Sequence, residues 1–273
     1  MRLLSILPIA RGIRLEILTY FSAKDIPVGT MVSIPLRKKI VPGIIIESED
    51  ALQNKSAIKG MDFSIKKILQ HKEDISLPLW LMSASKKIAE QSVTSVGGVI
   101  ASILPKICLE QPEIFFQQKR DAPVTKGHFE FLAIQSAEDE RFDTYKSIIR
   151  ESFAKKKSVV VILPTLESAK SISESLSKGI SDYVVLLGDP GSKKNLKIFF
   201  EKAHDDTHPL LIIGTYHVLS LLPESIGTLI LEEESSRFYK SQRQPFLDAR
   251  IVACEVARSL SIRFIVGDKL LSV

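Results

Sequence analysis

Short apolar runs alternate with amphipathic segments over residues 128–273. The runs "SVVVILP" (158–164), "PLLIIGT" (209–215) and "GTLILEE" (227–233) are each bounded by polar residues. Between such runs, segments including 141–157 and 246–261 carry apolar residues at helical spacing. Apolar strands that alternate with amphipathic helices are typical of a parallel sheet covered on both faces. We therefore predict an α/β domain over 128–273.

The first 68 residues have a different pattern. Short runs rich in Ile, Leu and Val are separated by Gly, Pro and Asp, which predicts a small β-rich domain. The stretch "TMVSIPLRKKIVPGIIIES" (30–48) predicts an antiparallel hairpin with Arg37, Lys38 and Lys39 at its tip. Residues 69–127 then predict a pair of helices broken at Gly97-Gly98, followed over 106–127 by an irregular linker.

Composition and charge narrow the class of protein. No apolar run reaches the roughly 18 residues that a membrane span needs, and Cys108 and Cys254 lie far apart without CxxC spacing. We therefore expect a reduced, cytoplasmic setting without membrane contact. The net charge is +5, and residues 1–75 hold 12 Lys and Arg against 8 Asp and Glu. The basic excess in this quarter points to a polyanionic partner.

The α/β domain opens with a strand, a loop and a helix, and a later strand ends in a run of acidic residues. This order suggests a nucleotide-binding site. Such a site needs a glycine-rich loop and a Lys for phosphate. Here no glycine lies between Gly127 and Gly179, and the expected loop carries Glu138, Asp139 and Glu140, which repel a triphosphate. The run Glu232, Glu233 and Glu234 ends an apolar strand, where carboxylates hold magnesium in ATPases.

The C-terminal half resembles the first motor lobe of the primosomal protein N′ family, replication-restart helicases of superfamily 2. The positions that fall in register are Gly214-Thr215, Gly227, Glu233-Glu234, Tyr239-Lys240, Ala249-Arg250 and Gly267. The resemblance implies a RecA-like lobe with degenerate ATPase motifs. The phosphate-binding Lys and Thr of the family fall on Arg141 and Phe142, and Glu232–Glu234 replace an acidic box that begins with Asp. We accordingly expect no catalytic residues, no metal and no ATP.

The N-terminal part resembles the 3′-DNA-binding domain of the same family. The similarity runs through "LPIARGIRLEILTYF" and the basic hairpin, and residues 75–106 resemble the helical pair that follows. It implies a DNA site formed by Arg14, Glu16, Arg37, Lys38 and Lys39, in which the Glu16 carboxylate accepts from a free 3′-hydroxyl. Residues 106–127 leave no room for the winged helix of the family, and the chain stops after one motor lobe.

Three functions remain open. The first is a shortened, non-catalytic relative of the primosomal helicase that binds a fork or a single-strand 3′ end, with replication-restart proteins as further partners. The second is an ATP- and magnesium-dependent helicase subunit completed by another chain. The third is a structural interaction protein that binds neither DNA nor nucleotide. The acidic residues at 138–140 disfavour the second, and the basic bias of residues 1–75 disfavours the third.

Overall fold

The computed structural model describes residues 1–12, 16–50, 65–116, 127–205 and 207–272. The chain divides into two compact units, Met1–Asp121 and Ala122–Val273. None of the helices in the described residues is long and apolar enough to cross a membrane.

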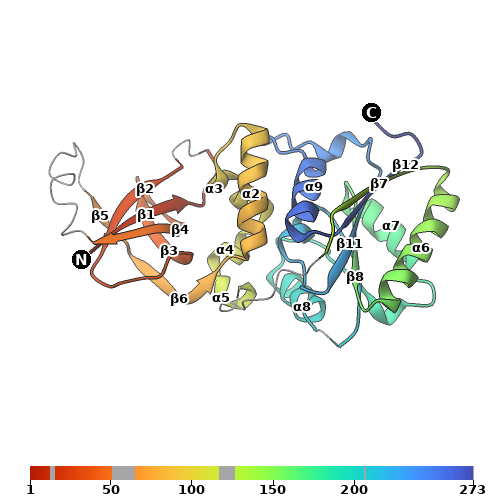
Figure 1. Cartoon of the computed structure of the whole chain (residues 1–273), viewed down its shortest axis with the longest axis horizontal. Helices are drawn as coiled ribbons and strands as arrows, with labels where there is room; N and C mark the ends of the chain where they lie inside the picture. The colour runs from red at the N-terminus through yellow and green to blue at the C-terminus, as the bar shows by residue number, and fades with distance from the viewer. Residues whose placement is uncertain (13–15, 51–64, 117–126, 206, 273) are drawn as a thin grey trace. The chain divides into compact units, whose positions relative to one another are not determined.

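The first unit is built on a curled six-stranded sheet (Figure 1). Its strand order is β5-β2-β1-β4-β3-β6, and the pairs are antiparallel except for β2 with β5. The strands are β1 (Arg2–Pro8), β2 (Leu18–Ser22), β3 (Thr30–Leu36), β4 (Lys39–Asp50), β5 (Lys66–Lys67) and β6 (Gln70–Ser76). Leu4, Ile6, Ile34 and Ile45 are fully buried in its core. The predicted hairpin of β3 and β4 is present, with Arg37 in the left-handed region of backbone space at its turn.

The described residues of this unit also form the helices α2 (Leu79–Ser92), α3 (Val96–Ile103), α4 (Lys106–Glu110) and α5 (Pro112–Phe115). The sequence predicted a break between these helices at Gly97-Gly98. In the structure, α2 ends and α3 begins on either side of Val93–Ser95 instead. The Ser95 hydroxyl caps α3 by accepting from the N–H of Gly98. Gly97 lies against β1, where a Cβ would stand 1.9 Å from the carbonyl oxygen of Pro8. The glycine therefore allows close packing of α3 on the sheet.

The sheet and helices extend beyond the ranges expected from the sequence. Strand β6 continues the sheet past residue 68, and α4 and α5 occupy part of the segment 106–127 that was expected to be irregular. Strand β6 pairs with β3 although most of its seven residues are polar. Pairing in a sheet overrides the weak local preference of such a segment.

The second unit is a six-stranded, wholly parallel sheet in the order β7-β12-β11-β8-β10-β9, as the alternating pattern predicted. Its strands are β7 (Glu130–Gln135), β8 (Ser158–Ile162), β9 (Val184–Leu186), β10 (Leu211–Gly214), β11 (Ile226–Glu232) and β12 (Arg263–Asp268). Its helices are α6 (Glu138–Ala154), α7 (Leu166–Leu176), α8 (Lys193–Ala203) and α9 (Ala249–Leu260), with 3₁₀ turns η1 (Ser181–Tyr183), η2 (Tyr216–Ser220) and η3 (Arg237–Tyr239). This is the architecture of a RecA-like lobe.

The parallel arrangement brings the carboxyl ends of distant strands to one edge of the sheet. Strands β7, β12 and β11 are neighbours, and in register Glu232 lies beside Gly267, which lies beside Ile134. Helix α6 starts only two residues after β7, so it begins at this same edge (Figure 1). Ligands of open α/β sheets bind at such an edge.

Candidate functional site

A buried ion pair occupies the carboxyl edge of the second sheet. Arg141 projects from the first turns of α6 and Glu232 ends β11, and their side chains are only 5% and 3% exposed. The Arg141 Nε lies 2.9 Å from both carboxylate oxygens, and Nη2 donates to Glu232 Oε1 at 2.5 Å. Arg141 Nη1 donates to the Ser136 carbonyl at 2.6 Å. Arg141, which we expected at the position of a phosphate-binding Lys, is therefore bonded to the first residue of the acidic run.

Tyr145 and Gly267 close the space around this pair. The Tyr145 hydroxyl donates to Glu232 Oε2 at 2.6 Å from one turn farther along α6. A Cβ at Gly267 would lie 1.7 Å from the Tyr145 hydroxyl and 2.9 Å from Glu232 Oε2. A glycine is thus required on β12 for the three side chains to meet.

The electrostatics match this geometry. The hydrogen bonds that Arg141 donates to the Glu232 carboxylate raise the pKa of the Arg141 guanidinium, so Arg141 stays charged. Burial raises the pKa of the Tyr145 hydroxyl, and the neighbouring Glu232 carboxylate raises it further, so Tyr145 stays a neutral donor. Arg141, Tyr145 and Glu232 thus form a buried ion pair whose charges are hydrogen-bonded. Buried charges in proteins are stable when they are paired in this way.

The arrangement does not fit a magnesium–triphosphate. The Glu232 carboxylate already accepts from Arg141 and Tyr145, and the Arg141 charge that would face phosphate is directed at Glu232. Glu138, Asp139 and Glu140 lie in the first turn of α6, not in a loop as the sequence suggested. Carboxylates suit a helix N-terminus because they face its positive dipole, and there they oppose a bound anion. Among the described residues, no group of three or more His, Cys, Asp and Glu is placed to hold a metal.

The other two glutamates of the run point elsewhere. Glu233 has a left-handed backbone (φ 55°), and burial raises the pKa of its carboxyl despite a hydrogen bond with the Ser168 side chain. Glu234 accepts from the backbone N–H and hydroxyl of Ser272, each at 2.8 Å, and lies 3.5 Å from Arg250 Nη1. The three carboxylates therefore have different partners and do not converge on one site.

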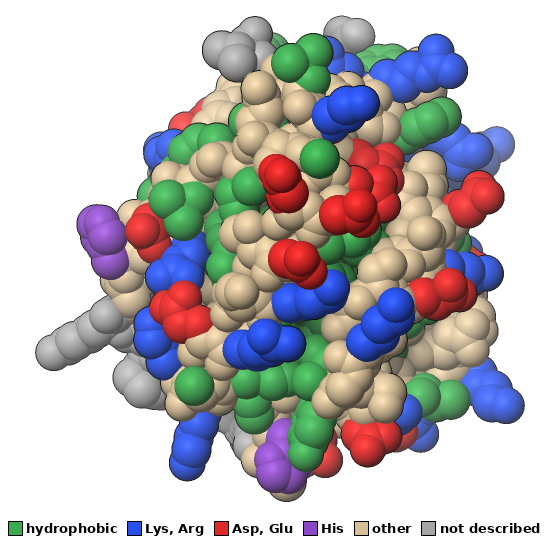
Figure 2. All heavy atoms as spheres, turned by 90° about the vertical axis from the view of Figure 1, so that its right-hand side faces the viewer, with side chains coloured by type: hydrophobic (Ala, Val, Ile, Leu, Met, Phe, Trp, Pro, Cys, Tyr) green, Lys and Arg blue, Asp and Glu red, His purple; other side chains and the backbone are tan. Residues whose placement is uncertain are grey.

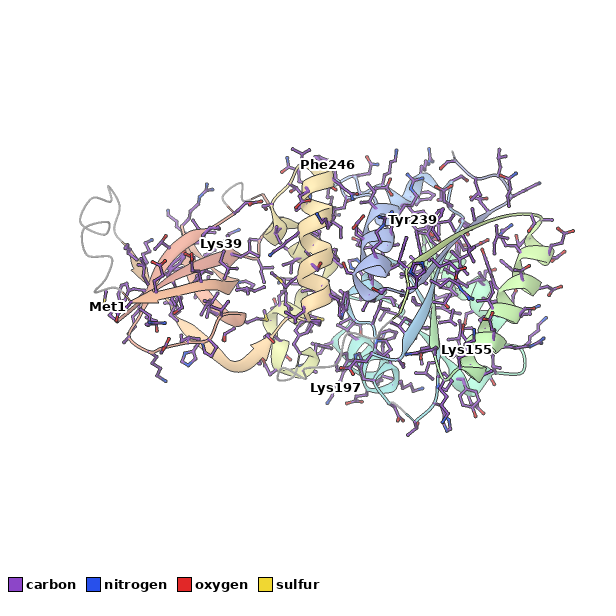
Figure 3. The ribbon with its side chains drawn as sticks, viewed as in Figure 1. Met1, Lys39, Lys155, Lys197, Tyr239 and Phe246 are labelled. Atoms are coloured by element: carbon purple, nitrogen blue, oxygen red, sulfur yellow. The ribbon has the colours of Figure 1, made fainter. Side chains whose placement is uncertain are left out.

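The residues expected to bind DNA lie at one end of the first sheet, except Arg14, which lies outside the described residues. Glu16 is exposed just before β2, at the end of the sheet where β1 finishes. Arg37, Lys38 and Lys39 are exposed in the β3–β4 hairpin at that same end (Figure 3 labels Lys39). β1 and β4 lie between β2 and β3, so this end presents one carboxylate and three cations without a direct contact between them.

An anchored loop rich in basic and aromatic residues was not predicted. It spans residues 235–247 after β11 and contains no Asp or Glu. The hydroxyl of the buried Tyr239 is hydrogen-bonded to the backbone carbonyls of Glu232 (2.5 Å) and Ile162 (3.0 Å). An isolated antiparallel β-bridge between the backbones of Lys240 and Asp248 closes the loop. The side chains that it exposes are Ser235, Arg237, Phe238, Lys240, Gln242, Arg243, Gln244 and Phe246.

The exposed aromatic rings are the unusual feature of this loop. Phe238 and Phe246 are 64% and 62% exposed, and the Arg237 guanidinium lies 5.5 Å from the centre of the Phe238 ring. The density of Arg, Lys and Phe between 237 and 246 was the available signal, but only the structure shows which rings face solvent.

Comparisons with known proteins agree with the resemblance read from the motifs. The chain is 25% identical over 261 residues to the replication restart protein PriA of Helicobacter pylori strain ATCC 700392 / 26695, and 24% identical to that of strain J99 / ATCC 700824. Each match covers 92% of this chain and 40% of the relative, so the chain spans well under half the length of these relatives. No family model matches. A solved structure of RecG bound to a three-way DNA junction aligns at TM-score 0.32 and 14% identity, over 55% of this chain and 19% of that chain.

The fold and the site together define a RecA-like α/β lobe, joined in one chain to a β-rich unit, with a buried arginine–glutamate pair at the carboxyl edge of its sheet. The similarity to the two Helicobacter proteins extends over both units. The chain is therefore similar over most of its length to replication restart proteins of the PriA type.

Proposed function

We propose that this chain is a DNA-binding, non-catalytic relative of the replication-restart helicases, which binds a fork or a single-strand 3′ end through its N-terminal unit. The observation that carries the proposal is the buried pair of Arg141 with Glu232. The resemblance to the primosomal family implies that these two positions correspond to those that bind phosphate and magnesium there.

Phosphoryl transfer depends on positive charge directed at the transferred group. Before Arg141 could face a phosphate, it would have to leave Glu232, and separating one partner of a buried pair costs about 3–5 kcal/mol. Glu138, Asp139 and Glu140 add repulsion at the start of α6. These features support a lobe that serves as a scaffold and not as a motor.

Two exposed surfaces support DNA binding. The β3–β4 hairpin offers Arg37, Lys38 and Lys39 for phosphates, with Glu16 at the same end of the sheet to accept from a 3′-hydroxyl. In the second unit, Phe238 and Phe246 offer faces on which bases stack, and Arg237 and Arg243 supply charge. The H. pylori relatives are named replication restart proteins, which agrees with a DNA partner.

Fluorescence anisotropy tests the DNA site. A fork with a free 3′-hydroxyl should bind more tightly than the same fork with a 3′-phosphate, and Glu16→Ala should remove the difference. Lys38→Ala/Lys39→Ala should flatten the dependence of log K on log salt by about 0.7 for each lost phosphate contact. Lys66→Ala/Lys67→Ala is the matched control, because it removes two exposed lysines from β5 in the same unit. Equal effects of the two double variants would refute the hairpin site.

The alternative is an ATPase subunit completed by another chain. It predicts DNA-stimulated ATP hydrolysis and a nucleotide-induced thermal shift, both lost in Glu233→Gln. We expect neither signal from the wild-type chain. If both appear and depend on Glu233, the non-catalytic proposal is wrong even if the chain binds DNA, whereas absence of DNA binding would favour a structural interaction protein.

A further inference from the structure

A further cation, Arg11, lies at the end of the first sheet that carries the candidate DNA residues. It is exposed in the turn that follows β1. In the sheet, β1 lies between β2 and β4. The turn after β1 therefore starts between Glu16, which precedes β2, and the hairpin that joins β3 to β4. Arg11 thus stands at the gap between the carboxylate and the three cations of the hairpin.

The turn that carries Arg11 is held on two sides. The Ile9 N–H donates to the Pro42 carbonyl of β4 at 2.8 Å, and Ile9 is 2% exposed. Two residues farther on, Arg11 Nε donates to the carbonyl of Ala101, in the last turn of α3, at 3.3 Å. The guanidinium is therefore held beside a helix while its side chain stays exposed.

Helix capping explains only part of this guanidinium. The last carbonyls of a helix lack partners within it, and a cation suits that end because the helix dipole is negative there. Arg11 Nε alone meets this need. Among the described residues, no acidic side chain pairs with Arg11, and its two terminal nitrogens have no hydrogen-bond partner. An arginine whose Nε is fixed and whose terminal nitrogens are open is suited to bidentate binding of phosphate.

The cations of the second unit are placed differently. Figure 2 shows that Lys and Arg lie among Asp and Glu on the side of this unit that carries α6. On α6 itself, Lys146 pairs with Asp143 and Lys155 pairs with Glu151. Their charge is already matched, whereas the charge of Arg11 is available to a polyanion. Arg11 shares its end of the sheet with one carboxylate and three further cations, Glu16, Arg37, Lys38 and Lys39.

The spacing of the strands relates Arg11 to one phosphate of a bound strand. Neighbouring strands lie about 4.8 Å apart, so the turn after β1 starts one strand from β2, and β4 lies two strands from it. Lys39 also stands three residues beyond Pro42 along β4, which at about 3.4 Å per residue adds roughly 10 Å. If Glu16 accepts from a 3′-hydroxyl, the phosphate of that same nucleotide is therefore nearer to Arg11 than to the hairpin.

We propose that Arg11 binds the phosphate of the 3′-terminal nucleotide, while the hairpin cations bind phosphates farther along the strand. The proposal rests on the 3′-end site proposed above and adds the residue that fixes the position of the strand in it. Contacts to one hydroxyl and one phosphate of the same nucleotide leave that nucleotide a single register. Arg11 can supply the second contact because α3 holds it in place, whereas the hairpin lysines supply charge.

Fluorescence anisotropy with a modified strand tests this assignment. The probe is a fork with a free 3′-hydroxyl in which an uncharged methylphosphonate replaces the last internucleotide phosphate. The replacement should weaken binding to the wild-type chain about tenfold, and binding to Arg11→Gln less than about twofold, because this variant has already lost the partner of that phosphate. Lys38→Ala/Lys39→Ala should still show the loss of about tenfold, since its missing contacts lie elsewhere.

Two further variants separate the contact from a general effect on the unit. Arg2→Gln is the matched control, because it removes an arginine from the opposite end of β1 and should behave as the wild-type chain does. Arg11→Lys keeps the charge without the Nε bond to Ala101, so it should retain part of the methylphosphonate effect. Fluorescence of Trp80, on α2, shows on heating that the first unit of each variant is folded.

The outcomes distinguish this assignment from the 3′-end site itself. If methylphosphonate weakens binding equally in the wild-type chain and in folded Arg11→Gln, or leaves wild-type binding unchanged, the role of Arg11 is overturned and the 3′-end site stands. If the wild-type chain binds forks with a 3′-hydroxyl and a 3′-phosphate equally, the site itself is wrong, and the role of Arg11 is wrong with it.

Discussion

Replacing Glu232 with Gln should destabilise the second unit more than any other single charge removal within it. Glu232 is 2% exposed and accepts hydrogen bonds from Arg141 and Tyr145. The amide keeps the shape of the carboxyl group but loses its charge and turns an NH₂ group toward these donors. The guanidinium of Arg141 is then buried without a counter-charge.

The expected magnitude follows from this burial. Removing one partner of a buried ion pair costs about 3–5 kcal/mol, because the other charge remains uncompensated. A typical domain has a total stability of about 5–15 kcal/mol, so this loss is a large fraction of it. For a domain of roughly 150 residues, each kcal/mol moves the midpoint of thermal unfolding by about 2–4 °C. We expect the midpoint of the second unit to fall on the order of 10 °C.

The assay can separate the two units. The chain has a single tryptophan, Trp80, which lies on α2 in the first unit. Tryptophan fluorescence therefore follows the first unit, while circular dichroism follows the helices of both. In Glu232→Gln, the circular dichroism transition should shift to lower temperature, and the fluorescence transition should stay in place.

Two further variants decide whether the ion pair is the cause. Glu130→Gln removes the carboxylate from an exposed pair with Arg263, and it should cost at most about 1 kcal/mol. The triple variant Arg141→Met/Tyr145→Phe/Glu232→Met removes every polar partner together and should recover most of the lost stability. If Glu232→Gln costs no more than Glu130→Gln, or if the triple variant is less stable than Glu232→Gln, the reasoning is refuted.

Three other predictions concern neighbouring features. Gly267→Ala should cost about 1–3 kcal/mol by circular dichroism, because its Cβ meets the Tyr145 hydroxyl, whereas Gly188→Ala, with open space around it, should be nearly silent. Phe238→Ala should weaken single-stranded DNA binding in anisotropy by about 1–3 kcal/mol, and Ile198→Ala should not. Burial raises the pKa of Glu233, so its contribution to stability is full below the unfolded pKa of about 4.3 and is lost as pH rises through the folded pKa. Glu233→Gln should therefore gain in thermal midpoint over the wild-type chain between acidic and neutral pH; an offset that does not change with pH contradicts this.

Much of the fold could be predicted from local pattern. The alternation of apolar runs with amphipathic segments predicted the parallel sheet, and "TMVSIPLRKKIVPGIIIES" predicted the β3–β4 hairpin. Such patterns work because each depends on the period of side chains along one element. Where local signals were weak, the predictions missed: polar β6 joins the sheet through pairing, and Gly97 packs against β1 instead of ending a helix.

The sequence by itself determined that Arg141 and Phe142 follow one apolar strand and that Glu232–Glu234 end another, and its resemblance to the primosomal family led us to expect degenerate nucleotide positions there. Only the tertiary structure decided what they do there. Arg141 and Glu232 are 91 positions apart, and they meet because strand order places β7, β12 and β11 side by side with a glycine between them. The same order makes β7 the outermost of the described strands on its side of the sheet. Strand order depends on crossovers and packing between distant segments, which no local period records.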